Sequence, residues 1–150
     1  MTFAPRTLAL VMLIGSATLG ASPAAAQNRA SCAVRQVLGS KDPGGLAPDI
    51  KFLAPQLSRP PFTAWKSFKY LSRTDLQMTK DEPKELVLAT GRHKLTLTYL
   101  GREGKQLRLR MKIGPKYLDV TYKIVGGGTF LQVGLPHDNG TVIIAATCKG

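Results

Sequence analysis

The chain has 150 residues, and its 21 lysine and arginine residues against nine acids give a formal net charge of +12. This length suits one domain with its own hydrophobic core and excludes a chain of several domains. A positive charge of this size favours anionic partners such as lipid head groups, polysaccharides or nucleic acid. Solubility is the alternative explanation for the same charge.

The first 26 residues predict a secretory signal peptide. Arg6 precedes an apolar run over residues 8–14, and small residues then lead to Ala24, Ala25 and Ala26. This order of charge, apolar run and small-residue cleavage site is typical of export signals. The apolar run is too short for a membrane-spanning helix. We therefore expect residues 27–150 to form a single β-rich domain that acts in the periplasm or outside the cell.

Two cysteines, Cys32 and Cys148, lie near opposite ends of that domain. In an oxidising compartment an even pair of this kind predicts a disulfide bond. The bond would place the first and last strands side by side, because bridged Cα atoms lie within about 7 Å. The two thiols lack the clustered ligands of a zinc site and the close spacing of a thioredoxin-like pair.

Residues 46–57 predict the one short helix of the domain, near its N-terminus. Pro48 suits a first turn, and Ile50, Leu53 and Leu57 recur at helical spacing. An aromatic stretch over residues 62–70 follows and contains the single tryptophan, Trp65. Two interpretations stay open for Trp65: a stacking platform for sugars or bases, or an anchor that packs the helix onto the sheet.

Short strands separated by turns fill the rest of the chain. The first begins at Cys32 and stops before a turn-rich break at residues 39–45. The others are expected at residues 68–78, 85–89, 94–100, 105–113, 117–125, 130–134 and 141–147. The glycines at 126–128 indicate a wide hairpin turn, and Asn139-Gly140 indicates a tight one. Such spacing predicts a mainly β fold, an antiparallel sandwich or barrel of about seven to eight strands.

Residues 105–125 form the clearest pattern, a β-hairpin with one apolar and one basic face. Leu107, Leu109, Met111 and Ile113 alternate with basic residues, and a period of two is the signature of a half-buried strand. If residues 94–100 pair with this hairpin, the outer face also gains threonines. The candidate anion-binding residues are Lys94, Arg108, Arg110, Lys112 and Lys123. Protection of exposed strands against aggregation is the alternative role for these charges.

Aromatic residues are sparse on this basic face. Tyr117 is its only aromatic candidate. Single-stranded nucleic acids are held largely by stacking on aromatic rings. The face therefore suits an anionic polysaccharide or lipid better than a nucleic-acid platform.

Catalytic residues are not assigned. His93 and His137 are the two histidines, and both are expected in turns. His137 precedes Asp138, which would suit a hydrolase, but no nucleophile-elbow motif accompanies the pair. The glycines at 126–128 are followed by a predicted strand, whereas phosphate-binding loops lead into a helix. We expect no metal and no cofactor.

Residues 33–40, 44–48, 57–62 and 67–69 resemble those of small exported bacterial proteins with no assigned activity. The resemblance extends to residues 140–145 and implies export and a single domain. The predicted signal peptide, the series of strands and the missing catalytic constellation indicate a non-catalytic β-sandwich that acts as a binding or envelope-associated module. The partner would be an anionic envelope polymer or another exported protein. A cationic module for polysaccharide, lipid or nucleic acid and a hydrolase are the alternatives.

Overall fold

The computed structural model describes residues 23–150, and most of this part of the chain is β-strand. The predicted signal peptide lies largely outside the described residues; its last few, with Gln27, form the short helix α1 (Pro23–Gln27). Among residues 23–150, no helix has the length and apolar character needed to cross a bilayer. The first strand begins at Arg29, three residues before the predicted start at Cys32.

Two sheets are formed by the described residues. One has five strands in the order β2-β3-β1-β9-β8, and the other is a meander in the order β4-β5-β6-β7. The strands are β1 (Arg29–Ser40), β2 (Gly45–Leu46), β3 (Ser67–Thr79), β4 (Pro83–Val87), β5 (Lys94–Glu103), β6 (Gln106–Ile113), β7 (Leu118–Val125), β8 (Thr129–His137) and β9 (Gly140–Lys149). All neighbours are antiparallel except β2 and β3. The predicted mainly β fold, an antiparallel sandwich, is confirmed. The sequence did not predict β2, because two residues are too few to show alternation.

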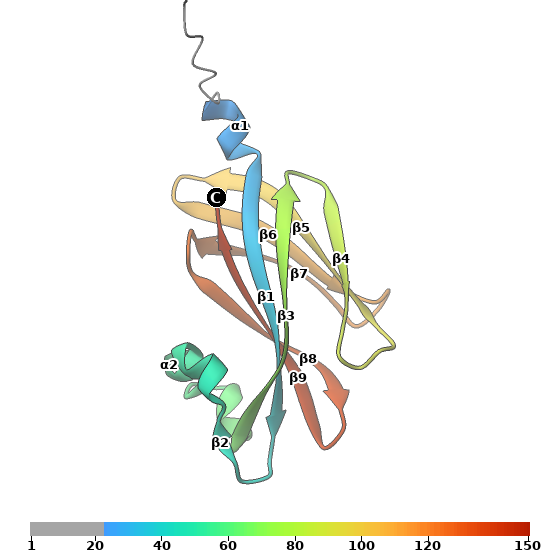
Figure 1. Cartoon of the computed structure of the whole chain (residues 1–150). Coiled ribbons are helices and arrows are strands. Elements are labelled where there is room, and N and C mark those ends of the chain that lie inside the picture. Colours follow the sequence, from blue (N-terminus) through green and yellow to red (C-terminus); the bar gives the residue numbers. More distant parts are fainter. Residues whose placement is uncertain (1–22) are drawn as a thin grey trace, which may run out of the picture.

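The main core lies between the two sheets, whose strands cross one another in Figure 1. The apolar side of β6 is fully buried there: Leu107, Leu109 and Met111 are 0% exposed and Ile113 is 1% exposed. Their partners across the core include Val34 of β1 and Ile144 of β9. The alternation predicted for residues 105–113 is therefore confirmed, and it assigns one side of the hairpin to the core.

A second, smaller core covers part of the outer face of the five-stranded sheet. Ile143 of β9 and Val37 of β1 point away from the main core, and both are 0% exposed. They pack against Ile50, Leu53 and Leu57 of the helical segment that follows β2. Strand β9 is thus buried on both faces, which explains its uninterrupted run of apolar residues.

The helical segment is less regular than the sequence predicts. Instead of one helix over residues 46–57, it begins with the 3₁₀ helix η1 (Pro48–Leu53), which is kinked at Ile50. A single α-helical turn, α2 (Ala54–Leu57), and a second 3₁₀ turn, η2 (Phe62–Ala64), follow. Pro55 has no N–H to donate within the helix, so a continuous hydrogen-bonded helix cannot run through this segment. The predicted apolar spacing is confirmed, since the Ile50, Leu53 and Leu57 side chains are all buried.

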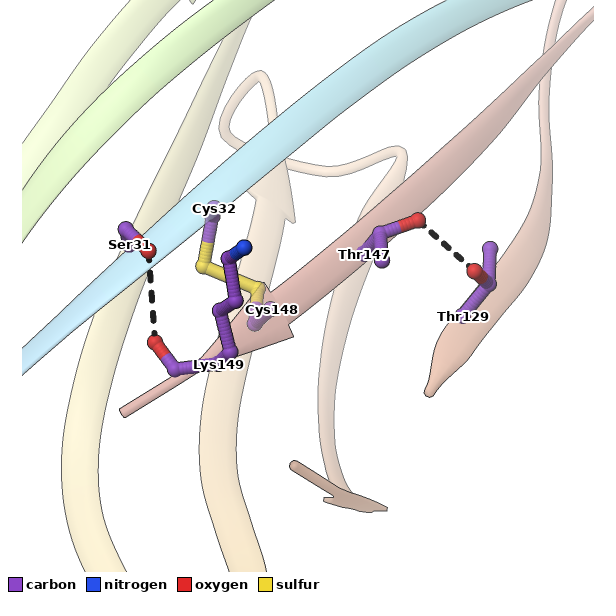
Figure 2. The surroundings of a disulfide bond; sticks show 6 residues. All are labelled: Ser31, Cys32, Thr129, Thr147, Cys148 and Lys149. Carbon is purple, nitrogen blue, oxygen red and sulfur yellow. Dashed lines mark hydrogen bonds between the residues drawn. A yellow bond between two sulfur atoms is a disulfide. The ribbon is translucent and has the colours of Figure 1, made fainter. Parts of the chain in front are cut away.

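Cys32 and Cys148 form the predicted disulfide bond. They lie directly opposite one another in the β1–β9 ladder, with Cα atoms 4.1 Å apart. Figure 2 shows two hydrogen bonds beside the bridge: Ser31 Oγ donates to the Lys149 carbonyl, and the Thr129 and Thr147 hydroxyls lie 2.7 Å apart. The chain end therefore lies next to the start of β1, as Figure 1 also shows.

Two turns differ from the sequence prediction. The glycines at 126–128 do not close a hairpin; they connect β7 of one sheet to β8 of the other. The Gly128 N–H donates to the Val125 carbonyl and the Gly127 N–H to that of Cys148, both at 2.7 Å. Strand β8 also runs further than expected, so that His137 ends the strand and pairs with Gly140.

Candidate functional site

The outer face of the four-stranded sheet contains the five predicted anion-binding side chains. They come from β5, β6 and β7, and the strand register places threonines among them. The cross-strand pairs on this face include Thr96 with Lys112, Thr98 with Arg110, and Lys123 with Arg108. Lys94 begins β5 on the same face. We call this set, Lys94, Arg108, Arg110, Lys112 and Lys123, the cationic face.

Acidic side chains lie between these cations. The ion pairs are Lys94 with Glu85 (3.2 Å), Arg108 with Glu103 (3.2 Å), Lys123 with Glu103 (2.6 Å) and Arg110 with Asp119 (2.6 Å). In the part of the chain that the structure describes, Lys112 is the cation of the face without an ion pair. The five cations outnumber the three acids by two, so the face keeps a positive excess.

The ion pairs of two acids, Asp119 and Glu103, shift pKa values on the cationic face. A two-pronged hydrogen bond from the Arg110 guanidinium lowers the pKa of Asp119 and raises that of Arg110. A hydrogen bond from Lys123 lowers the pKa of Glu103 in the same way. All of these groups are exposed, and exposed ion pairs contribute little because water screens them. The ion pairs of the cationic face therefore add little to the stability of the fold.

Tyr117 lies just before β7, at the turn between β6 and β7, and is 62% exposed. Its ring meets the His93 ring edge-on, with centroids 4.8 Å apart. The tyrosine is therefore at one end of the cationic face rather than among its cations.

Trp65 lies between η2 and β3 and packs against the five-stranded sheet, away from the cationic face. It is half-buried and packs beside Phe62 in the second core. Its ring covers Gly39 of β1 so closely that a Cβ at residue 39 would lie 2.9 Å from the Trp65 Cγ. These contacts support the anchor interpretation. Trp65 also lines an open groove of about 450 Å³ with Leu46, Leu57 and other residues, so part of its side chain faces that groove.

A shallow trough on the outer face of the five-stranded sheet was not predicted. It measures about 350 Å³ and lies over small residues of β1 and β9, including Ala33 and Thr147. Arg35, Arg73 and Lys149 are among its lining residues. The Arg35 guanidinium also lies over the ring of Phe52, 4.8 Å from the centroid. The alternation of residues along β1 indicates that one side of the strand faces outward. Too few residues on that side are polar for the sequence to predict a binding surface there.

A polar hollow of about 310 Å³ brings together the two histidines. It lies between the β4–β5 loop and the β8–β9 turn, and is lined by Thr90, Arg92, His93, Pro136, His137 and Asp138. His137 Nε2 is 3.4 Å from Asp138 Oδ2. We call this the histidine hollow. The sequence offered no signal for it, because its two halves meet only when the sheets stack.

Gln36 holds one wall of the histidine hollow in place. This β1 side chain is 3% exposed and points between the sheets. Its amide donates to the Val87 carbonyl (3.2 Å) and accepts from the Ala89 N–H (2.6 Å). Both bonds anchor the beginning of the β4–β5 loop, which contains Thr90, Arg92 and His93. The loop is therefore positioned by a buried polar contact with the opposite sheet.

The hydrolase hypothesis requires a nucleophile beside His137. The six residues that line the histidine hollow include neither serine nor cysteine within the described range, and their one hydroxyl group is that of Thr90. Comparisons with protein-family models, curated proteins and solved structures give no match to this chain. The resemblance to exported bacterial proteins thus stays a prediction.

Proposed function

We propose that this chain is an exported, non-catalytic binding module that uses its cationic face to bind an anionic polysaccharide of the cell envelope. The observation behind this proposal is the row of Arg108, Arg110 and Lys112 along β6, continued by Lys123 and Lys94 on the neighbouring strands. Alternate residues of a strand are about 7 Å apart on one face. A polymer with repeated anionic groups can contact several of these cations at once, which raises its apparent affinity.

Polysaccharide is favoured over other polyanions by the neutral residues of the face. Thr96, Thr98 and Thr121 supply hydroxyls that can hydrogen-bond to sugar hydroxyls. Tyr117 is at the edge and contacts His93, so that among residues 23–150 no aromatic ring lies between the cations for bases to stack on. Export is supported by the Cys32–Cys148 bond, because disulfides persist in oxidising compartments.

Charge reversal on the face tests this proposal. We expect the triple variant Arg108→Glu, Arg110→Glu, Lys112→Glu to bind heparin on the order of a hundredfold more weakly, since each cation near an anionic surface contributes about 1 kcal/mol. The matched control reverses Lys41, Lys51 and Lys69, three exposed lysines of the other sheet and its helical segment. Heparin affinity is measured by titration calorimetry at several salt concentrations.

The control variant shows whether heparin binding depends on the position of the reversed charges or only on the net charge of the chain. Equal losses in both triple variants would mean that only the net charge acts, and the proposal would be wrong. Vesicles containing phosphatidylglycerol and a single-stranded oligonucleotide are titrated in parallel, and tighter binding to either would overturn the choice of polysaccharide. A neutral variant with glutamine at residues 108, 110 and 112 checks that lost binding does not reflect repulsion between Asp119 and a new carboxylate.

A further inference from the structure

The histidine hollow contains two buried polar atoms without hydrogen-bond partners. Thr90 Oγ1 and His93 Nδ1 both lack a partner among the described residues. Buried polar groups in folded proteins nearly always have one, and the exceptions call for an explanation such as a ligand. Both atoms belong to the loop that Gln36 anchors, so their positions are set by the fold rather than by a freely moving segment.

The other side chains of the hollow also favour an anion. Arg92 is exposed and forms no ion pair within residues 23–150, so its guanidinium remains available. His137, the last residue of β8, lines the same hollow. The one carboxylate that lines it, Asp138, already contacts His137 and has 73% of its side chain exposed. Guanidinium, imidazole and hydroxyl donors together form a typical oxyanion-binding set.

A metal ion fits this set poorly. Two imidazoles and one carboxylate line the hollow, but no cluster of three or more metal-ligating side chains is close enough to hold an ion in the described part of the chain. Arg92 would also repel a cation at short range. The charge of the hollow therefore favours a negatively charged occupant.

We propose that the histidine hollow binds a small tetrahedral oxyanion, the phosphate or sulfate group of a small molecule or of a polymer terminus. Arg92 supplies the charge, and Thr90 and His93 supply donors that otherwise have no partner. His137 closes the site from the opposite sheet. This site is separate from the cationic face, which none of these four residues belongs to.

Imidazole NMR tests the proposal directly, because the chain has only two histidines and both line the hollow. The disulfide-bonded protein is titrated with inorganic phosphate at constant pH. We expect both imidazole signals to move along one saturable curve with a Kd of about 1 mM or below. Sodium chloride at equal ionic strength should leave them in place.

Variants distinguish phosphate binding in the hollow from the general electrostatic attraction of phosphate to a positively charged chain. Arg92→Gln should raise the Kd for phosphate at least about tenfold, because it removes a charge-assisted hydrogen bond. Arg59→Gln, which removes an exposed arginine of the helical segment, should leave the Kd unchanged. Thr90→Val keeps the shape of the side chain but removes the hydroxyl, and should weaken binding severalfold.

Several outcomes would overturn the oxyanion site. One is linear, unsaturated shifts up to about 50 mM phosphate, a range in which specific sites of this affinity saturate. Another is an equal effect of Arg92→Gln and Arg59→Gln. A third is saturation of the imidazole signals by micromolar zinc chloride, which would assign the hollow to a metal instead. None of these results bears on heparin binding by the cationic face, so the two proposals fail independently.

Discussion

The end of the sandwich near Cys32 and Cys148 is closed by a covalent bond, whereas the end near the two histidines is closed by loops that Gln36 holds through hydrogen bonds. At the first end, side chains beside the bridge are paired, as with Thr129 and Thr147. At the second end, two buried polar atoms have no hydrogen-bond partner within the described part of the chain. Available space does not separate the two ends, because the trough of about 350 Å³ lies beside the bridge. The difference is that the histidine hollow, formed by loops, contains buried polar atoms without hydrogen-bond partners among the described residues.

Removal of the disulfide should have the largest effect on stability. The bond joins residues separated by 116 positions. In the chain-entropy account, closing a loop of that length in the unfolded chain stabilises the folded state by on the order of 4 kcal/mol. We expect the double variant Cys32→Ala, Cys148→Ala to lose about that much free energy of unfolding. Urea unfolding followed by the fluorescence of the single tryptophan measures it. A loss below about 1 kcal/mol would show that the strand pairing closes this end without help from the bond.

Removal of the Gln36 contact should have the next largest effect. Gln36→Leu leaves the Val87 carbonyl and the Ala89 N–H without their partner, at a cost of about 2 kcal/mol. Hydrogen exchange at the Ala89 amide should also become faster, because the loop then opens without global unfolding. Gln77→Leu is the matched control, since Gln77 is exposed on β3. Unchanged exchange at Ala89 would contradict the anchoring role of Gln36.

The smallest effect is expected away from both ends, at Asp119 on the cationic face. Its pKa is lowered by the hydrogen bond from Arg110, so the unfolded chain takes up this proton more readily than the folded one. The contribution to stability is present above the usual aspartate value of about 3.9 and is lost as the pH falls through the lower folded value. Asp119→Asn should therefore reduce the loss of stability between about pH 5 and about pH 2.5.

Urea midpoints at both pH values measure this acid effect. The control is Asp49→Asn, which removes an exposed carboxylate that has no ion pair in the described part of the chain. An equal change in both variants would mean that general charge, and not the contact with Arg110, sets the acid response. High salt should also diminish the Asp119 effect, because exposed pairs are screened.

The sequence by itself determined most of the strands of this protein and which of their faces are apolar. Alternation with a period of two identified eight of the strands, and it assigned Leu107, Leu109 and Met111 to the core, where all three are fully buried. It also grouped the candidate cations on one face. These properties follow from side chains that alternate between the two faces of a strand, which depends only on neighbouring residues. The Cys32–Cys148 pairing was equally predictable, because two cysteines allow one intramolecular bond.

Only the tertiary structure decided which distant residues meet. Residues 126–128 connect two sheets instead of closing a hairpin, and nothing local distinguishes the two uses of a glycine turn. The acids that pair with the cationic face come from neighbouring strands and a strand end, so their positions depend on register. His93 and His137 lie on opposite sheets and share a hollow only because the sheets stack. The residues that form this candidate site are far apart in the sequence, and only the packing of one sheet on the other brings them together in space. That packing depends on contacts between distant parts of the chain, which no local sequence pattern encodes.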